Sequence, residues 1–76
     1  MKMWISRSEI GDLFLFSSKP SYDECGMEWF KEYHFTDDII VDFGYRIDSK
    51  LYPEVTFENS PQEVELVIEK QDENRD

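Results

Sequence analysis

Residues 2–17 read KMWISRSEIGDLFLFS, two apolar runs joined by a short polar connection. The runs at 2–6 and 13–17 are rich in branched and aromatic side chains, which favour strands. Gly11 lies in the connection, and a short glycine-containing link between two such runs is typical of a β-hairpin. Pro20 ends the second run, because proline cannot donate a hydrogen bond to a neighbouring strand. This stretch therefore predicts an antiparallel β-protein.

The C-terminal part alternates between apolar and acidic side chains. In an extended chain Val64, Leu66 and Ile68 fall on one face and glutamates fall on the other, where Val67 is the exception. This period of two predicts a final strand over residues 62–69.

The middle of the chain is less regular. Residues 21–28 contain turn-forming and acidic side chains and predict a loop. Residues 29–35, WFKEYHF, are dense in aromatic side chains and predict a strand, with a short helix as the alternative because some of them lie four apart. Residues 39–47, IIVDFGYRI, predict one strand, in which Gly44 indicates a bulge or a close approach of another backbone.

The segment 48–53 predicts a turn, with one helical turn as the alternative. Residues 54–57 predict a short extended piece. We therefore expect a mainly β domain (α+β if the short helix forms), a small antiparallel sheet or half-barrel of four to five strands. Residues 1–70 are expected to form this single acidic domain, and residues 71–76, which contain no apolar side chain, a frayed tail.

The composition describes a folded but strongly charged chain. Eighteen acidic and eight basic side chains give 76 residues a net charge of −10, yet 39% of the residues are hydrophobic. High charge prevents folding only when hydrophobicity is also low, so we expect a packed core. The acidic surplus disfavours direct binding to nucleic acid and favours basic protein partners. No stretch is long and apolar enough to span a membrane, and the start does not resemble a signal peptide, which predicts a cytoplasmic protein.

The residue types that carry catalysis or bind metals are few. Cys25 and His34 are the only cysteine and the only histidine, so neither an intrachain disulfide nor a four-ligand zinc site can form. The aspartates at 37, 38 and 42 could act as acid–base groups, but the first two coincide with an expected turn. The EF-hand pattern is absent. We expect no enzymatic activity, no metal and no cofactor.

The acidic face of the final strand is the strongest functional signal. Side chains two apart on a strand are about 6.7 Å apart on one face, so glutamates there form a line of negative charge. This row comprises Glu63, Glu65 and Glu69, extended by Glu54 and Glu58. Such a row either keeps the protein soluble or binds a partner built to accept phosphates.

Aromatic side chains are the second interface signal. Twelve aromatic residues are hard to bury completely in a domain of this size, and exposed aromatic rings are common anchors of protein interfaces. The interface candidates are Tyr22, Trp29 and Tyr33. The alternative is that these rings pack the core.

Two blocks, 4–20 and 51–66, carry a resemblance. The first contains WISR, GDLFLF and the Lys-Pro pair; the second contains LYPEVTFENSP followed by EVEL. In these blocks the chain resembles small uncharacterised proteins of bacteriophages and bacterial mobile elements. The resemblance implies a mobile-element origin, hence the cytoplasm of a bacterial host, and a shared fold with a first hairpin and a final acidic strand. It brings no catalytic residues.

These observations lead to a ranked set of functions. The first is a non-enzymatic acidic module that binds a basic host protein and inhibits a defence or nucleic-acid-handling factor, in the manner of an anti-CRISPR or DNA-mimic protein. The second is a homo-oligomeric structural or accessory protein that associates through an edge strand or exposed aromatics. The third, a small enzyme or metal-dependent sensor, depends on Asp42, His34 and Cys25 meeting in space.

Overall fold

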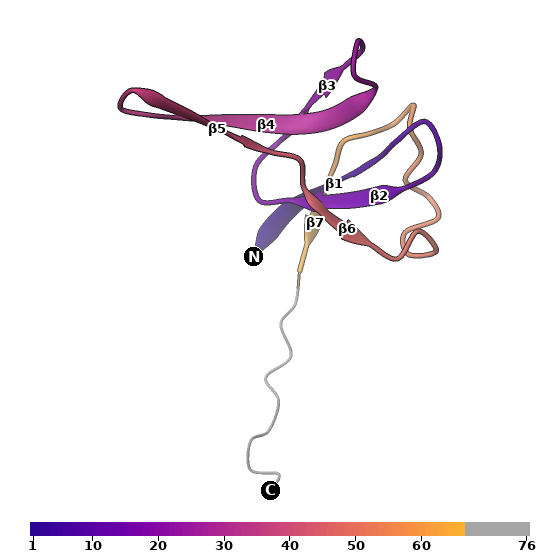
Figure 1. Ribbon diagram of the computed structural model, residues 1–76. Helices are drawn as coiled ribbons and strands as arrows, with labels where there is room; N and C mark the ends of the chain where they lie inside the picture. The colour runs from indigo at the N-terminus through magenta and orange to yellow at the C-terminus, as the bar shows by residue number, and fades with distance from the viewer. Residues whose placement is uncertain (67–76) are drawn as a thin grey trace, which may run out of the picture.

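The computed structural model describes residues 1–66 and shows two antiparallel sheets with no helix in that range (Figure 1). The strands are β1 (Lys2–Arg7), β2 (Leu13–Phe16), β3 (Ser21–Asp23), β4 (Glu28–Phe35), β5 (Asp38–Asp42), β6 (Tyr45–Ile47) and β7 (Gln62–Glu65). One sheet has the order β6-β2-β1-β7, and the other has the order β3-β4-β5. The predicted mainly β class is confirmed. The described residues form seven strands in two sheets, where we expected four or five strands in one small sheet or half-barrel.

The predicted first hairpin is confirmed. Strands β1 and β2 pair with Ile5 opposite Leu15 and Arg7 opposite Leu13. Within the connection the Ser8 amide donates to the Asp12 carbonyl at 2.8 Å, and glycine at position 11 has a φ of +100°, which other residues rarely adopt. The hairpin forms the two central strands of the four-stranded sheet.

One face of this sheet carries the hydrophobic core. Ile5, Leu13 and Val55 are almost completely buried, and half-buried side chains of β2, β6, β7 and the 48–61 segment pack around them. In the described part of the chain this face is covered by the long connection between β6 and β7, to which Val55 belongs, and not by a strand. The core therefore depends on how this irregular connection is held.

The side chain of Arg7 binds the connection between β6 and β7. The guanidinium donates five hydrogen bonds to carbonyl oxygens: Nε to Val55 at 2.5 Å, Nη1 to Gly11 at 2.8 Å and Ser49 at 3.0 Å, and Nη2 to Leu51 at 3.1 Å and Tyr52 at 3.0 Å. A guanidinium has five N–H groups in a fixed planar arrangement, so every donor is used. One side chain thereby satisfies the carbonyls of a connection that has no neighbouring strand to do so.

The turn predicted at 48–53 is confirmed over its helical alternative, since these residues form turns and Tyr52 has a φ of 50°. The short extended piece predicted at 54–57 is wrong. Residues 54–57 do not form an extended strand: the Asn59 carboxamide oxygen accepts from the Thr56 amide at 2.8 Å, and the Thr56 hydroxyl accepts from the Asn59 amide at 3.2 Å. Local side-chain to backbone bonds of this kind compete with strand pairing.

The second sheet lies over the opposite face of the first (Figure 1). Residues 28–35 form strand β4, so the strand prediction for 29–35 is confirmed over the helical alternative. The loop predicted at 21–28 is partly wrong, because residues 21–23 pair with β4 as β3. The indole of Trp29 is 7% exposed, and its Nε1 donates to the Arg7 carbonyl at 3.0 Å. This bond fixes β4 to β1 of the other sheet.

The single strand predicted at 39–47 is wrong, because the segment divides between the two sheets. Strand β5 pairs with β4, and strand β6 pairs with β2. Between them Gly44 has a φ of +87°, and a Cβ placed on it would lie 2.7 Å from the Phe16 ring. The glycine does mark a close approach, but to the side chains of Phe16 and Phe14 and not to another backbone as predicted, and it lies at the crossing from one sheet to the other.

The final strand is confirmed over residues 62–65, where β7 pairs with β1. The rest of the predicted strand to 69, the end of the domain at 70 and the tail at 71–76 lie outside the described residues.

We expect Arg7→Met to lower the free energy of unfolding by about 2–4 kcal/mol, because the apolar stem remains while five carbonyls lose their donor. Urea unfolding measures this change. The matched control is Arg46→Met: Arg46 is exposed and makes one contact, at 3.4 Å to Asp12. Its loss should cost less than about 1 kcal/mol. Equal effects of the two substitutions would contradict the role assigned to Arg7.

We expect Gly44→Ala to destabilise the protein more than Gly11→Ala. Both positions have a positive φ, which costs alanine about 1–2 kcal/mol. A Cβ at Gly11 meets open space, whereas at Gly44 it clashes with Phe16, which adds about 1–3 kcal/mol. Thermal unfolding of the two variants checks the difference, and an equal loss for both would refute a close crossing at Gly44.

Candidate protein-interaction surface

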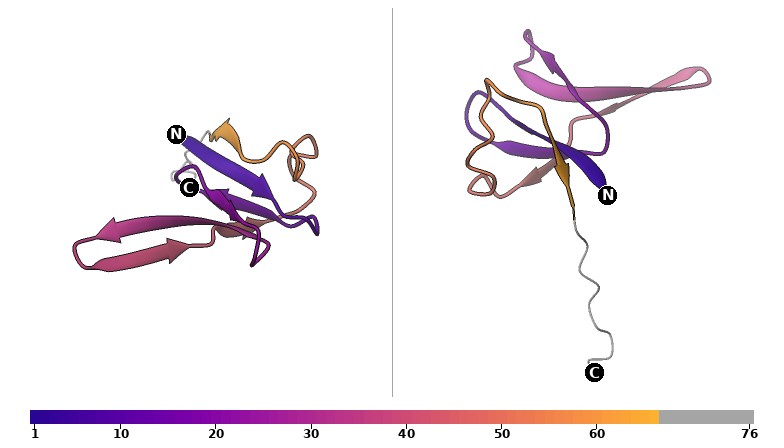
Figure 2. Two further views of the ribbon diagram at one scale, coloured as in Figure 1. Left: turned by 90° about the horizontal axis from the view of Figure 1, so that it is seen from above. Right: turned by 180° about the vertical axis from the view of Figure 1, so that it is seen from behind.

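The hairpin of β4 and β5 projects beyond the four-stranded sheet (Figures 1 and 2). We call residues 31–42 the arm; its register runs from Lys31 opposite Asp42 to Phe35 opposite Asp38. Every residue from 34 to 41 is exposed. A two-stranded hairpin without a packed face is of marginal stability in water, so the arm is the least supported part of the described fold.

The arm exposes large apolar side chains on both faces. Phe35 is 63% exposed and Ile40 55% exposed on one face, and Ile39 is 58% and Val41 41% exposed on the other. Contiguous exposed apolar side chains on a folded protein mark interaction sites. The arm is therefore the main apolar surface available to a partner.

Among residues 1–66 no strand pairs with the outer edge of β5, because β5 is the terminal strand in the order β3-β4-β5. An apolar edge strand readily accepts another strand through its free backbone groups. Two carboxylates, Asp38 and Asp42, stand at the ends of Ile39-Ile40-Val41. The edge is thus apolar in the middle and negative at both ends.

The acidic row predicted on the final strand is exposed where it is described. Glu63 and Glu65 lie on β7, opposite Trp4 and Lys2 respectively. The Glu65 carboxylate accepts from the N-terminal amine at 2.7 Å, so this charge is partly neutralised within the chain. Glu69 lies outside the described residues.

The connection before β7 adds two exposed glutamates to this side of the molecule. Glu54 and Glu63 line the same shallow hollow beside Val64. Glu58 is exposed on the same connection. The structure therefore brings Glu54 and Glu63 together, while Glu65 binds the chain start.

The three aromatic candidates take part in packing. Tyr22 lies between Trp29 and Phe57, with ring centroids 5.0 and 4.9 Å away. Trp29 is buried, and Tyr33 is half-buried with its hydroxyl 3.2 Å from the Ser17 hydroxyl. These rings join the second sheet to the first and to the 48–61 connection.

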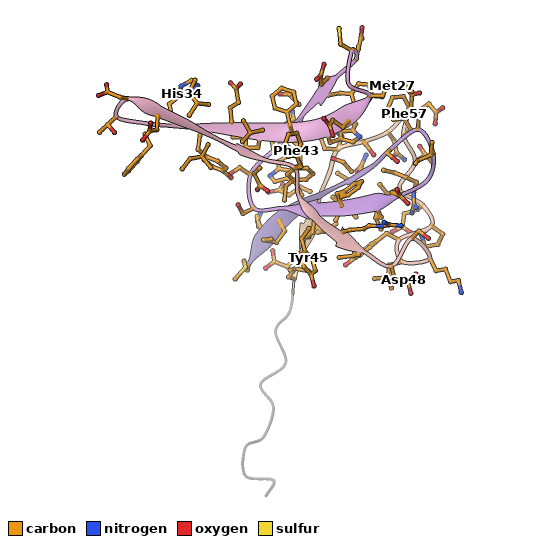
Figure 3. The ribbon with its side chains drawn as sticks, viewed as in Figure 1. Met27, His34, Phe43, Tyr45, Asp48 and Phe57 are labelled. Atoms are coloured by element: carbon orange, nitrogen blue, oxygen red, sulfur yellow. The ribbon has the colours of Figure 1, made fainter. Side chains whose placement is uncertain are left out.

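A cavity of about 360 Å³ lies where the two sheets meet, at the base of the arm. Its lining is mostly apolar with three carboxylates, and comprises Ser8, Glu9, Ile10, Asp12, Phe14, Met27, Glu28, Trp29 and Phe43. Figure 3 shows Phe43 between the sheets, where the chain passes from β5 to β6.

Sequence reasoning selected only Trp29 among these residues. Ile10, Met27 and Phe43 are 82%, 53% and 51% exposed. Each is next to one of the three glycines in the chain. Large apolar residues beside turn glycines are the signal that could have identified this cavity.

The residues considered for catalysis are dispersed. Cys25 is exposed in the β3–β4 turn, where its amide donates to the Asp23 carboxylate at 3.1 Å. His34 lies on the arm, at the other end of β4, with its Nε2 3.7 Å from the Glu32 carboxylate (Figure 3). Asp42 accepts from the Gly44 amide at 2.9 Å, a local turn role.

Residues 1–66 show neither a metal-binding cluster nor a membrane-spanning helix. No three acidic, histidine or cysteine side chains in this range are placed to hold a metal ion. No helix within it is long and apolar enough to cross a membrane.

Comparison with known proteins identified no similar protein. No protein-family model matches the chain. No curated protein matches it. No solved structure matches it either.

Two tyrosines differ in acidity. Desolvation against its neighbours, the hydrogen bond to Glu9 at 2.8 Å and nearby carboxylates raise the pKa of Tyr22 from 10.0 to about 12. Hydrogen bonds from Ser17 and Ser18 stabilise the phenolate of Tyr33 and lower its pKa.

We expect the ultraviolet titration of tyrosine to end in a step near pH 12 that is missing in Tyr22→Phe. A pKa raised in the folded state means that the protonated form is favoured by folding. The stabilisation by Tyr22 is therefore complete below pH 10 and lost as the pH rises toward 12. Tyr33→Phe is the control, since it removes an earlier step. A final step that persists in Tyr22→Phe would refute the assignment.

Proposed function

We propose that this protein is a non-enzymatic acidic module that binds a basic protein. The observation that carries the proposal is the outer edge of β5, where exposed Ile39, Ile40 and Val41 stand between Asp38 and Asp42. A partner strand pairs with this edge through backbone hydrogen bonds, and its apolar side chains cover the exposed ones. Lysine or arginine at its ends faces the two aspartates and supplies specificity.

Charge favours such a partner over a second copy of the chain. If two β5 strands paired antiparallel over all five residues, Asp38 of one would lie opposite Asp42 of the other at both ends. Like charges directly opposite each other destabilise strand pairs. Homo-oligomerisation through this edge is therefore the second candidate.

The resemblance to phage and mobile-element proteins extends the proposal to a place of action. We infer that the partner is a defence or nucleic-acid-handling protein in the cytoplasm of a bacterial host, inhibited as an anti-CRISPR or DNA mimic would inhibit it. Proteins that handle nucleic acid carry basic surfaces, which a chain of net charge −10 attracts. The exposed carboxylates at Glu54 and Glu63 add to this attraction.

The test is capture from a bacterial lysate by immobilised protein, followed by mass spectrometry. The arm variant is Ile39→Thr with Val41→Thr, which keeps branched side chains on an exposed strand while removing apolar surface. The matched surface variant is Glu54→Gln with Glu63→Gln. We expect a basic protein to be captured by the wild type and, in a smaller amount, by the surface variant, which keeps the arm but lacks two of the attracting charges. The arm variant should lose at least about tenfold in captured amount.

Salt and self-association decide between the alternatives. Raising the ionic strength from about 0.05 to 0.5 M should release the partner, because the Debye length shortens severalfold. Capture that is indifferent to salt would contradict charge recognition. Recovery of the bait alone, running as a multimer, would overturn the proposal in favour of a homo-oligomer.

A further inference from the structure

We propose that the cavity between the two sheets is a binding pocket for an arginine side chain presented by the partner. This inference rests on the proposed function and names the group that the module recognises. The pocket combines aromatic walls with a carboxylate rim and lies at the base of the arm, since Phe43 follows β5 directly.

The walls suit a flat, weakly hydrated cation on an apolar stem. Phe14, Trp29 and Phe43 contribute three aromatic rings, and Met27 adds a flexible thioether. A guanidinium stacks on aromatic faces, and its three methylenes fill apolar space, whereas an ammonium is compact and strongly hydrated. The cavity volume of about 360 Å³ is large enough for a whole side chain of this length.

One wall is fixed in advance. The Trp29 indole is 7% exposed, its Nε1 donates to the Arg7 carbonyl at 3.0 Å, and Tyr22 packs against it. The Trp29 ring is therefore already held in one orientation before a ligand stacks on it. Preorganisation of this kind reduces the entropy lost on binding.

The rim supplies the charge. Glu9, Asp12 and Glu28 are carboxylates that line the opening. Asp12 faces Arg46 at 3.4 Å, and Tyr22 donates to Glu9 at 2.8 Å. Among residues 1–66, no basic side chain forms an ion pair with Glu9 or Glu28. Two carboxylates are thus free to accept from a guanidinium, which binds carboxylates through parallel hydrogen bonds.

Exposed apolar side chains in the lining of the pocket carry a cost in free energy while no ligand covers them. Ile10, Met27 and Phe43 are each more than half exposed. Met27 also has a φ of 59°, a left-handed conformation that is unfavourable for a large side chain. Strained residues of this kind gather at ligand clamps. An arginine stem in the cavity covers this apolar surface.

The experiment is an NMR titration of the isotope-labelled protein with Nα-acetyl-arginine amide. The matched neutral probe is Nα-acetyl-citrulline amide, which has nearly the same shape, and Nα-acetyl-lysine amide tests for a compact cation. We expect saturable shifts of the Trp29 indole N–H and the Met27 methyl with a dissociation constant of about 1–10 mM for arginine. Binding of citrulline and lysine should be at least about fivefold weaker.

The variants Glu28→Gln and Glu9→Gln should weaken arginine binding at least about threefold. The control Glu58→Gln removes the same charge from an exposed position outside the lining and should leave binding unchanged. Equal loss for Glu58→Gln would overturn the pocket in favour of a general acidic field. Equal binding of citrulline, or a Trp29 signal that does not move, would also overturn it.

This readout is independent of partner capture. Shifts at Trp29 without any captured protein would support the pocket and leave the proposed function contradicted. Capture that depends on the arm, with no response to arginine at Trp29, would support the function and overturn the pocket.

Discussion

The described fold depends on one guanidinium. Arg7 ends the central strand β1 and donates to five carbonyls of the hairpin turn and the 48–61 connection. The same residue's carbonyl accepts from the Trp29 indole. The side chain therefore holds the cover of the core, while the backbone holds the second sheet. The chain has a single cysteine, and residues 1–66 contain no cluster of side chains placed to hold a metal ion, so these hydrogen bonds do the work that disulfides or metals do in many small domains.

The two faces of the four-stranded sheet, both of which Arg7 contacts, are covered to different extents. One face is closed by the long connection over Ile5 and Leu13. The other supports a second sheet that covers it only in part, so that β5 extends past the body and a cavity remains beneath its base. The buried core lies on the first face, whereas the exposed apolar side chains of the arm lie on the side of the second sheet. The interaction proposals follow from that division.

The sequence predicted those parts of the fold that local patterns specify. Apolar runs rich in branched and aromatic side chains identified β1 and β2, alternation of apolar and acidic residues identified β7, and aromatic density identified β4. Local patterns did not predict that residues 39–47 divide between the two sheets. The chain crosses from one sheet to the other at Gly44, next to Phe16, and such a contact between residues far apart in the sequence leaves no local signal. The row at Glu63 and Glu65 was visible in the sequence, whereas the cavity was not, since its walls come from three separate parts of the chain, 8–14, 27–29 and 43, that meet only after folding.

The pairing of β1 with β7 has a consequence for synthesis. Lys2 lies opposite Glu65, so the two strands that complete the four-stranded sheet are separated by almost the whole described chain. Sheets built from such distant pairings fold slowly, because a long loop must close before the contacts form. On a ribosome β1 has one unpaired edge until residue 65 has emerged from the exit tunnel. The four-stranded sheet therefore cannot be completed before this last strand is available, and until then the free edge of β1 can pair with other chains.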